Sequence, residues 1–292
     1  AVRLCPQLTI LPPRMAYYQL ISRQIRAIFQ RSTALIEPVS LDEAYLDVSD
    51  STLYQGSATL IAEDIRTTLK RELNLPASAG VAPNKFLAKI CSDENKPNGQ
   101  FVLTPATMEA FVLALPLGKI PGVGKVTVAK LDKLGLNTCS DVRKYGEAKL
   151  AGHFGRFAQH LYQRACGIDN RELTTHWIRK SVSVERTFAD DFSSLEDTES
   201  AINALFKELT HRLEKYSHRL IKNQVVKLKF ENFQQTTMER AGDKLNRSAI
   251  QALLESAWDR GEGKAVRLIG LGVNFEDPEE PDESQMTLFD GT

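Results

Sequence analysis

The chain has 292 residues, 42% of them hydrophobic and 25% charged, which predicts a globular protein of two or three domains. No apolar run approaches the roughly 18 residues of a membrane span and no signal peptide is recognisable, so we expect no membrane partner and a cytoplasmic location. The four cysteines are scattered without a C-x-x-C pair. That pattern favours reduced thiols over a disulfide framework.

The formal net charge of zero conceals an uneven distribution. Residues 276–292 contain seven acidic residues and no Lys or Arg, which leaves 37 basic against 30 acidic residues in residues 1–275. Residues 107–179 alone contain eleven Lys and Arg against six Asp and Glu. A basic body with an acidic tail indicates a polyanionic partner, although charges that only solvate a surface would give the same balance.

Residues 36–50, IEPVSLDEAYLDVSD, predict a buried strand with an acidic pair in its middle. The residues expected to be buried are Val39, Leu41, Ala44, Tyr45, Leu46 and Val48. In a continuous strand Asp42 and Glu43 would point to opposite faces, and burying one carboxylate is costly. A bend at SLDE would let both project into one cleft, where Mg²⁺ binds one or two carboxylates together with substrate phosphates. Taken alone, however, an Asp-Glu turn is more often a solvated hairpin tip.

The rest of residues 1–106 alternates helix and strand signals. Apolar residues at helical spacing predict a helix over 57–73. A strand over 76–82, a helix over 84–94 and a strand over 100–104 follow, the last one after the KPNG turn. Together with the opening stretch they predict a small α+β domain with one sheet.

Residues 107–168 are basic, helical and interrupted by glycine. In IPGVGKV (120–126) one helix is expected to end near Leu115 and the next to start near Lys125. Gly122 and Gly124 can expose backbone N–H groups at a helix N-terminus, and Lys125 adds charge, which suits a DNA phosphate. This pattern resembles a helix-hairpin-helix motif, with GHFGRFA (152–158) as a degenerate second copy. An ordinary Gly-capped turn is the alternative.

Residues 169–179 lack a clear period and predict a linker. From residue 180 the signals are strand (182–190), helix (195–217), strand (224–232), strand (235–241), helix (248–260) and strand (265–275). This β-α-β-β-α-β order predicts a four-stranded sheet with both helices on one side. Val226, Leu228 and Phe230 would face the helices. Lys227 and Lys229 would make the open face basic, with Lys180 as a further DNA contact.

Three segments, SLDEAYLDV, SAGVAPNKFLAKICSDENKPNGQ and IPGVGKVTVAKL, resemble the Y-family of translesion DNA polymerases in their order and spacing. The resemblance covers nearly the whole chain. It implies a multidomain α+β protein with a palm at 1–106, a thumb at 107–168, a linker at 169–179 and a little-finger domain at 180–277. Residues 278–292 would be a disordered tail.

By this resemblance Asp42 is a metal-ligand aspartate and Glu43 the adjacent catalytic acid, together serving two Mg²⁺ ions. Lys96 in NKPNG matches the lysine that contacts the incoming triphosphate. Arg14 and Tyr18 lie where the family lines the nucleotide pocket. Lys85 either reaches the same cleft or is a solvated helix start. The implied partners are primer–template DNA and deoxynucleoside triphosphates, and the implied activity is error-prone nucleotidyl transfer by a monomer.

The chain begins at Ala1 without Met, and the family's first motif, with another metal-binding aspartate and most of the fingers, would precede it. We therefore expect an N-terminal segment to be missing and this polypeptide to have little or no polymerase activity. The alternative to a polymerase is a non-catalytic DNA-binding adaptor that is tethered to the DNA sliding clamp. A helix-hairpin-helix nuclease is a third possibility, but it explains neither the NKPNG lysine nor the β-α-β-β-α-β domain.

The acidic tail ends in QMTLF (285–289), which resembles the bacterial sliding-clamp binding peptide. Gln285 would supply an amide for hydrogen bonds, while Leu288 and Phe289 would fill an apolar pocket. The resemblance thus implies the DNA sliding clamp as a further partner.

Overall fold

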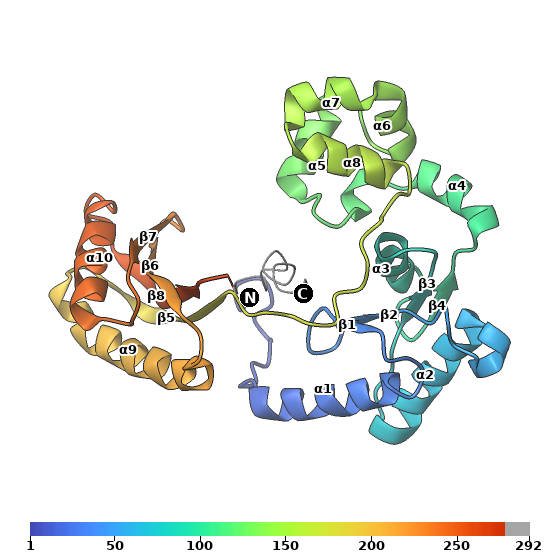
Figure 1. The fold of residues 1–292 in the computed structure, drawn as a ribbon. Helices are drawn as coiled ribbons and strands as arrows, with labels where there is room; N and C mark the ends of the chain where they lie inside the picture. Colours follow the sequence, from blue (N-terminus) through green and yellow to red (C-terminus); the bar gives the residue numbers. More distant parts are fainter. Residues whose placement is uncertain (278–292) are drawn as a thin grey trace, which may run out of the picture. The chain divides into compact units, whose positions relative to one another are not determined.

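The computed structural model describes residues 1–277, which form two compact units divided between His176 and Trp177 (Figure 1). Unit 1 runs from blue to yellow-green in Figure 1, and unit 2 from yellow to red. The division falls within the segment predicted as a linker, while the domain boundaries given above remain a prediction. The predicted clamp peptide, 285–289, lies outside the described residues.

The first part of unit 1 contains three helices and four short strands. They are α1 (Met15–Phe29), β1 (Ile36–Pro38), β2 (Ala44–Leu46), the 3-10 helix η1 (Leu53–Gly56), α2 (Ala58–Leu73), β3 (Ala79–Val81), α3 (Lys85–Glu94) and β4 (Gln100–Val102). The helices predicted over 57–73 and 84–94 are confirmed. Ser57 and Asn84 cap them, each accepting a hydrogen bond from the backbone N–H three residues later.

Two predictions for this part are wrong. Residues 36–50 form a hairpin rather than one buried strand, and Val39 is 52% exposed. The strand breaks because the N–H groups of Val39 and Ser40 both donate to the carbonyl of Glu43, which confirms the predicted bend at SLDE. The single sheet is also wrong, since β1 pairs only with β2 and β3 only with β4. All four strands are only three residues long, and no strand in residues 1–277 joins the β1–β2 ladder to the β3–β4 ladder.

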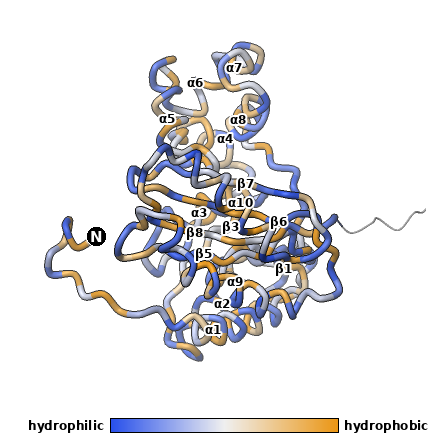
Figure 2. The backbone as a smooth tube through the Cα atoms, turned by 90° about the vertical axis from the view of Figure 1, so that its left-hand side faces the viewer, coloured by the Kyte–Doolittle hydropathy of each residue, from blue (hydrophilic) through white to orange (hydrophobic). Residues whose placement is uncertain are grey.

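The second part of unit 1 is helical, as predicted. It contains α4 (Pro105–Ala114), the 3-10 helix η2 (Leu117–Lys119), α5 (Lys125–Asp132), α6 (Cys139–Tyr145), α7 (Glu147–Phe154) and α8 (Phe157–Ala165). Hydrophobic and hydrophilic residues alternate along these helices (Figure 2). Their buried sides form one core with α3 and β4, extending from Phe86 to Ala165. This core fixes the helical segment onto α3.

Unit 2 confirms the predicted β-α-β-β-α-β order. Its elements are β5 (Ser181–Phe192), the 3-10 helix η3 (Glu196–Thr198), α9 (Glu199–Leu213), the 3-10 helix η4 (Glu214–Tyr216), β6 (Ile221–Phe230), β7 (Gln235–Ala241), α10 (Arg247–Asp259) and β8 (Val266–Phe275). The antiparallel sheet has the order β5-β8-β6-β7. Val226, Leu228 and Phe230 are buried in a core shared with α9 and α10, so both helices cover one face of the sheet.

The surroundings of the cysteines agree with reduced thiols. All four cysteines are free. Burial raises the pKa of Cys91 to about 11 and that of Cys139 to about 12, so both thiols stay protonated and inert at neutral pH. Among residues 1–277, none of the helices has the length and apolar character needed to cross a membrane.

Candidate active site and nucleic-acid interface

Asp42 and Glu43 lie at the tip of the β1–β2 hairpin. Ser40 organises this turn, because its Oγ donates to Asp42 Oδ1 over 2.7 Å and accepts from the backbone N–H groups of Asp42 and Glu43 over 3.3 and 3.1 Å. The Asp42 side chain is exposed and Glu43 is half-buried. The turn therefore places the consecutive residues Asp42 and Glu43 at one end of the hairpin, while the projection of both carboxylates into one cleft stays a prediction. A solvated hairpin tip would have the same backbone.

Glu43 has a partner that the sequence analysis missed. Lys89 on α3 donates from Nζ to Glu43 Oε1 over 2.5 Å. This hydrogen bond raises the pKa of Lys89 above its usual value, against the opposing effect of partial burial. The only signal in the sequence was that Lys89 follows Lys85 by one helical turn.

Lys85 lies beneath the hairpin, and the interpretation as a solvated helix start is wrong. Its side chain is 7% exposed, and Nζ donates to Glu37 Oε2 over 2.5 Å and to the carbonyl of Glu172 over 3.0 Å. The backbone N–H of Thr174 donates to the same Glu37 oxygen over 2.7 Å. Burial acts to raise the pKa of Glu37, but the bonds from Lys85 and Thr174 outweigh it, and the pKa lies below its usual value.

The segment that follows α8 is fixed by a second buried ion pair. Asp169 has a fully buried side chain that contacts Arg164 over 2.9 Å and Arg171 over 2.8 Å. It also accepts the backbone N–H of Phe86, in the first turn of α3, over 3.0 Å. Burial opposes ionisation, yet the two guanidinium groups lower the pKa of Asp169 to about 2. Residues 169–174 therefore join α8, α3 and β1, although they have no regular secondary structure.

The three residues predicted to contact the nucleotide are all exposed. Lys96 pairs with Asp93 over 2.5 Å, and about half of each side chain is exposed. Arg14 precedes α1 and stacks its guanidinium 4.9 Å from the ring centroid of Tyr17. Tyr18 follows in α1 and is also exposed. No hydrogen bond or ion pair of residues 1–277 joins Arg14, Tyr18 or Lys96 to the hairpin tip.

The chemistry of the hairpin tip fits part of a magnesium site. No three His, Cys, Asp or Glu side chains of the described residues form a cluster that would hold a metal ion. Mg²⁺ in phosphate-transfer sites, however, is bound by only one or two carboxylates, with water and substrate phosphates completing the shell. Asp42 and Glu43 supply that number of carboxylates, although one oxygen of Glu43 already accepts a hydrogen bond from Lys89.

The first glycine hairpin has the predicted position. α4 ends at Ala114 and α5 begins at Lys125, with Gly124 as its N-cap. Gly122 has a φ of +92°, a conformation that favours glycine. A Cβ at Gly122 or Gly124 would meet nothing within 4 Å, so the backbone at the start of α5 is open to a phosphate.

The predicted second copy of the motif has a shorter connection than the one between α4 and α5, which spans residues 115–124. Helix α7 ends at Phe154 and α8 begins at Phe157, so only Gly155 and Arg156 separate them. Gly155 has a φ of +54°, and a Cβ there would also meet open space. Both glycine turns therefore leave exposed backbone beside a basic residue, which is the arrangement that a DNA backbone contact requires.

The open face of the unit 2 sheet is less basic than predicted. Lys227 and Lys229 do point away from the core, but Lys227 pairs with Glu185 of β5 over 3.0 Å. The ammonium of Lys229 lies 4.8 Å from the ring centroid of Phe233. Lys180 is exposed and pairs with Asp277 over 3.2 Å. The carboxylates of Glu185 and Asp277 therefore offset part of the positive charge.

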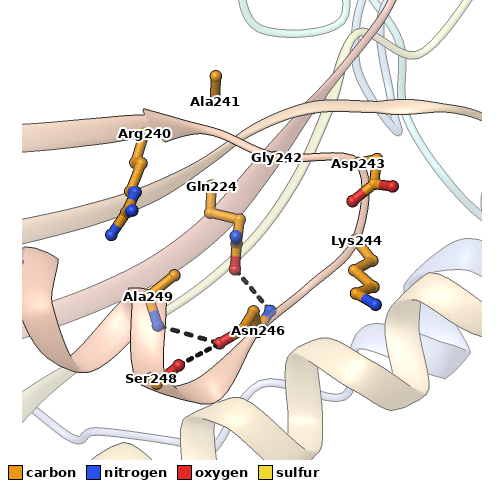
Figure 3. A pocket seen from close by; sticks show the side chains of 9 residues that line it. All are labelled: Gln224, Arg240, Ala241, Gly242, Asp243, Lys244, Asn246, Ser248 and Ala249. Carbon is orange, nitrogen blue, oxygen red and sulfur yellow. Dashed lines mark hydrogen bonds between the residues drawn. The ribbon is translucent and has the colours of Figure 1, made fainter.

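A cavity of about 470 Å³ lies elsewhere in unit 2, between the end of β7 and the start of α10 (Figure 3). Gln224 Oε1 accepts the backbone N–H of Asn246 over 2.7 Å, and Asn246 caps α10. The wall contains Arg240 and Lys244 but also Asp243. This mixed charge singles out no class of ligand, and the cavity contains none of the predicted site residues.

Most of the chain matches known protein families and sequences. The impB/mucB/samB family profile matches residues 1–93, its C-terminal domain profile matches residues 179–288, and a profile for the DNA polymerase-iota thumb domain matches residues 118–169. The DNA polymerase IV proteins of Yersinia enterocolitica and Escherichia coli K12 are 54% and 53% identical over 281 residues. The match spans 96% of this chain and 80% of each relative.

Comparison with solved structures gives the same fold. A chimera of the Y-family polymerases Dbh and Dpo4 has a TM-score of 0.83 at 23% identity, with coverage of 94% of this chain and 80% of the other. An insertion ternary complex of Dbh DNA polymerase has a TM-score of 0.60 at 22% identity and the same coverage. At 22–23% identity the similarity to these structures shows the fold alone. The family is shown by the DNA polymerase IV relatives, which are 53–54% identical.

Proposed function

The chain belongs to the impB/mucB/samB family of Y-family DNA-directed DNA polymerases, and from this premise we propose that Asp42 and Glu43 form its catalytic carboxylate pair. Translesion DNA synthesis is the activity that the polymerase IV relatives support. The observation that most supports the assignment of the site is the hairpin turn, in which Ser40 bonds both the Asp42 carboxylate and the backbone of Glu43 at the tip.

In the proposed reaction the 3′-hydroxyl of a primer attacks the α-phosphate of a deoxynucleoside triphosphate, and pyrophosphate leaves. Two Mg²⁺ ions, when bound, would supply charge neutralisation at the attacking and leaving oxygens. Asp42 and Glu43 would hold them. Lys96 would leave Asp93 and donate to the triphosphate, which its exposed position allows. Arg14 and Tyr18 would line the nucleotide pocket.

DNA would be held mainly through its phosphates. The open backbone at Gly122 and Gly124, together with Lys125, suits a phosphate at the start of α5. Lys180, Lys227 and Lys229 would add contacts from unit 2 after exchanging their present partners. Such contacts make binding tolerant of sequence and strongly dependent on salt.

Recruitment by the DNA sliding clamp is a further part of the proposal. It depends on residues 285–289, where Gln285, Leu288 and Phe289 match a clamp-binding pattern. We also propose that the enzyme acts as a monomer in the bacterial cytoplasm. A clamp pull-down with Leu288→Ala and Phe289→Ala together should lose the clamp while DNA binding is retained.

Residues 1–292 by themselves should extend primers poorly, because Asp42 and Glu43 alone would have to serve two Mg²⁺ ions. The test is single-nucleotide extension of a primed template with Mg²⁺, using this chain and a form preceded by the family's first motif. We expect extension only from the longer form, and Asp42→Ala should abolish it. A longer form that binds DNA and clamp without extending would favour the non-catalytic adaptor.

A further inference from the structure

Two lysines on one face of α3 hold the two ends of the β1–β2 hairpin. Lys85 and Lys89 are four residues apart, so their side chains lie on the same side of the helix. Lys89 contacts Glu43 at the tip, and Lys85 contacts Glu37 in β1. Glu37 is paired across the ladder with Tyr45, two residues beyond Glu43. The hairpin is thus attached to α3 at its tip and along its strands.

The contact at Glu37 is the more buried of the two. The side chains of Lys85 and Glu37 are 7% and 16% exposed, against 31% and 41% for Lys89 and Glu43. The ammonium of Lys85 also lies 5.3 Å from the ring centroid of Tyr45, so it contacts both strands of the hairpin. A buried, multiply bonded contact restricts the hairpin more than an exposed ion pair does.

Residues 169–174 complete this attachment. The backbone N–H of Thr174 donates to Glu37, and the carbonyl of Glu172 accepts from Lys85. Asp169 at the start of the segment is bonded to Arg164 of α8 and to the first turn of α3. The hairpin is therefore connected through one short segment to the last helix of the helical half of unit 1.

The hairpin lies outside the buried apolar core of unit 1. No residue from 36 to 48 is fully buried, and the hairpin contributes nothing to the buried core that α3 shares with the helices. Its two strands are three residues each, and within residues 1–277 they pair only with each other. The polar contacts must therefore set where the tip lies relative to α3.

We infer that Glu37, Lys85 and the segment 169–174 are positioning elements that hold Asp42 and Glu43 in place for nucleotidyl transfer. The inference rests on the proposed function, because it assumes that the hairpin tip is the reacting end. Neither Glu37 nor Lys85 touches substrate in this assignment. Both act through the backbone of the hairpin.

The test compares Lys85→Met with Lys85→Arg in the form of the chain that extends primers. Displacing a reacting group by about 1 Å can cost roughly 100-fold in rate, so Lys85→Met should lower kcat by about 10- to 100-fold. The KM for nucleotide and the Kd for primer–template should stay within about twofold, because these depend on other residues. Lys85→Arg keeps the positive charge and can donate to Glu37, so it should restore part of kcat.

A backbone variant tests the same attachment without altering the buried lysine. Thr174→Pro removes the N–H that donates to Glu37, whereas the matched control Thr175→Pro removes an N–H for which residues 1–277 provide no acceptor. We expect Thr174→Pro to lower kcat by several-fold relative to the control. Equal kcat values for the two proline variants would overturn the inference.

The outcomes separate this inference from the proposed function. If Asp42→Ala abolishes extension while Lys85→Met leaves kcat unchanged, the positioning role is wrong and the catalytic assignment stands. If Lys85→Met raises KM and Kd as much as it lowers kcat, or if Lys85→Arg fails to restore kcat, the role of Lys85 is purely structural. If Asp42→Ala still extends primers, the proposed function itself fails.

Discussion

The β1–β2 hairpin of unit 1 and the four-stranded sheet of unit 2 are held in place by different forces. The sheet buries alternate residues of β6 and of β8, such as Leu228 and Leu271, against two helices. The hairpin buries no residue fully and is attached through Lys85, Lys89 and Glu37. The sheet is positioned by the burial of apolar area, which has no directional preference. The hairpin is positioned by hydrogen bonds between charged groups, which are directional.

The difference follows the expected work of each region. If the sheet binds DNA as proposed, it needs a stable platform, and apolar burial provides stability at about 25 cal/mol per Å² without requiring exact geometry. A carboxylate pair needs a defined position, which directional contacts between charged groups supply at little net gain in stability. The comparison predicts that the two regions respond to different substitutions.

The largest effect is expected from Asp169→Ala in unit 1. The change leaves the buried Arg164 without its main counter-charge, and breaking a buried pair in this way costs about 3–5 kcal/mol. Thermal unfolding followed by far-UV circular dichroism should show an earlier transition. Glu72→Ala is the control, because the solvent-screened Glu72–Arg31 pair should contribute far less to stability than the buried pair. Similar losses for both variants would contradict the importance of burial.

Leu228→Ala should have a comparable or slightly smaller effect, confined to unit 2. Leu228 is fully buried in the sheet core, and such truncations cost about 2–5 kcal/mol. Both tryptophans, Trp177 and Trp258, belong to unit 2, so denaturation followed by their fluorescence reports on this unit. The neighbouring Lys229→Ala, on the open face, should shift the midpoint far less. A matching shift for Lys229→Ala would argue against an apolar basis for the sheet.

Acid should weaken unit 1 through Asp169. Its pKa is about 2 in the folded chain and about 3.9 unfolded, so its stabilisation is present above pH 4 and is lost as the pH falls towards 2. The contribution at neutral pH is about 2–3 kcal/mol. Unfolding of Asp169→Asn measured between pH 6 and pH 3 should lack this part of the pH dependence. An unchanged pH dependence would show that Asp169 is not the group concerned.

The smallest effects are expected at glycines, where the sheet and the helical hairpins differ in packing. A Cβ at Gly272 in β8 would lie 3.0 Å from the Cβ of Ser183, so Gly272→Ala should cost about 1–3 kcal/mol. A Cβ at Gly124 would meet open space, so Gly124→Ala should leave stability within about 0.5 kcal/mol. Its effect should appear instead as weaker binding of primer–template, measured by fluorescence anisotropy.

The sequence predicted unit 2 well because its strands alternate and its helices are long. The two-residue alternation of apolar residues is enough to predict that Val226 and Leu228 lie on the buried face of the sheet. The hairpin was predicted less well, because three-residue strands give no period and Val39 and Leu41 look like core. The bend followed from the cost of burying a carboxylate. Lys89 and the buried state of Lys85 could not be predicted, since their partners lie more than 40 residues away.

The measurement that tests this comparison most directly is amide hydrogen exchange of residues 36–46 and 221–230 in the wild type, Lys85→Met and Leu228→Ala. Loss of the buried Lys85 contact should speed exchange in 36–46 by about tenfold or more and leave 221–230 unchanged. Leu228→Ala should do the reverse. If Lys85→Met leaves the hairpin unchanged, or if both segments respond to both variants, the hairpin and the sheet are not held by different forces.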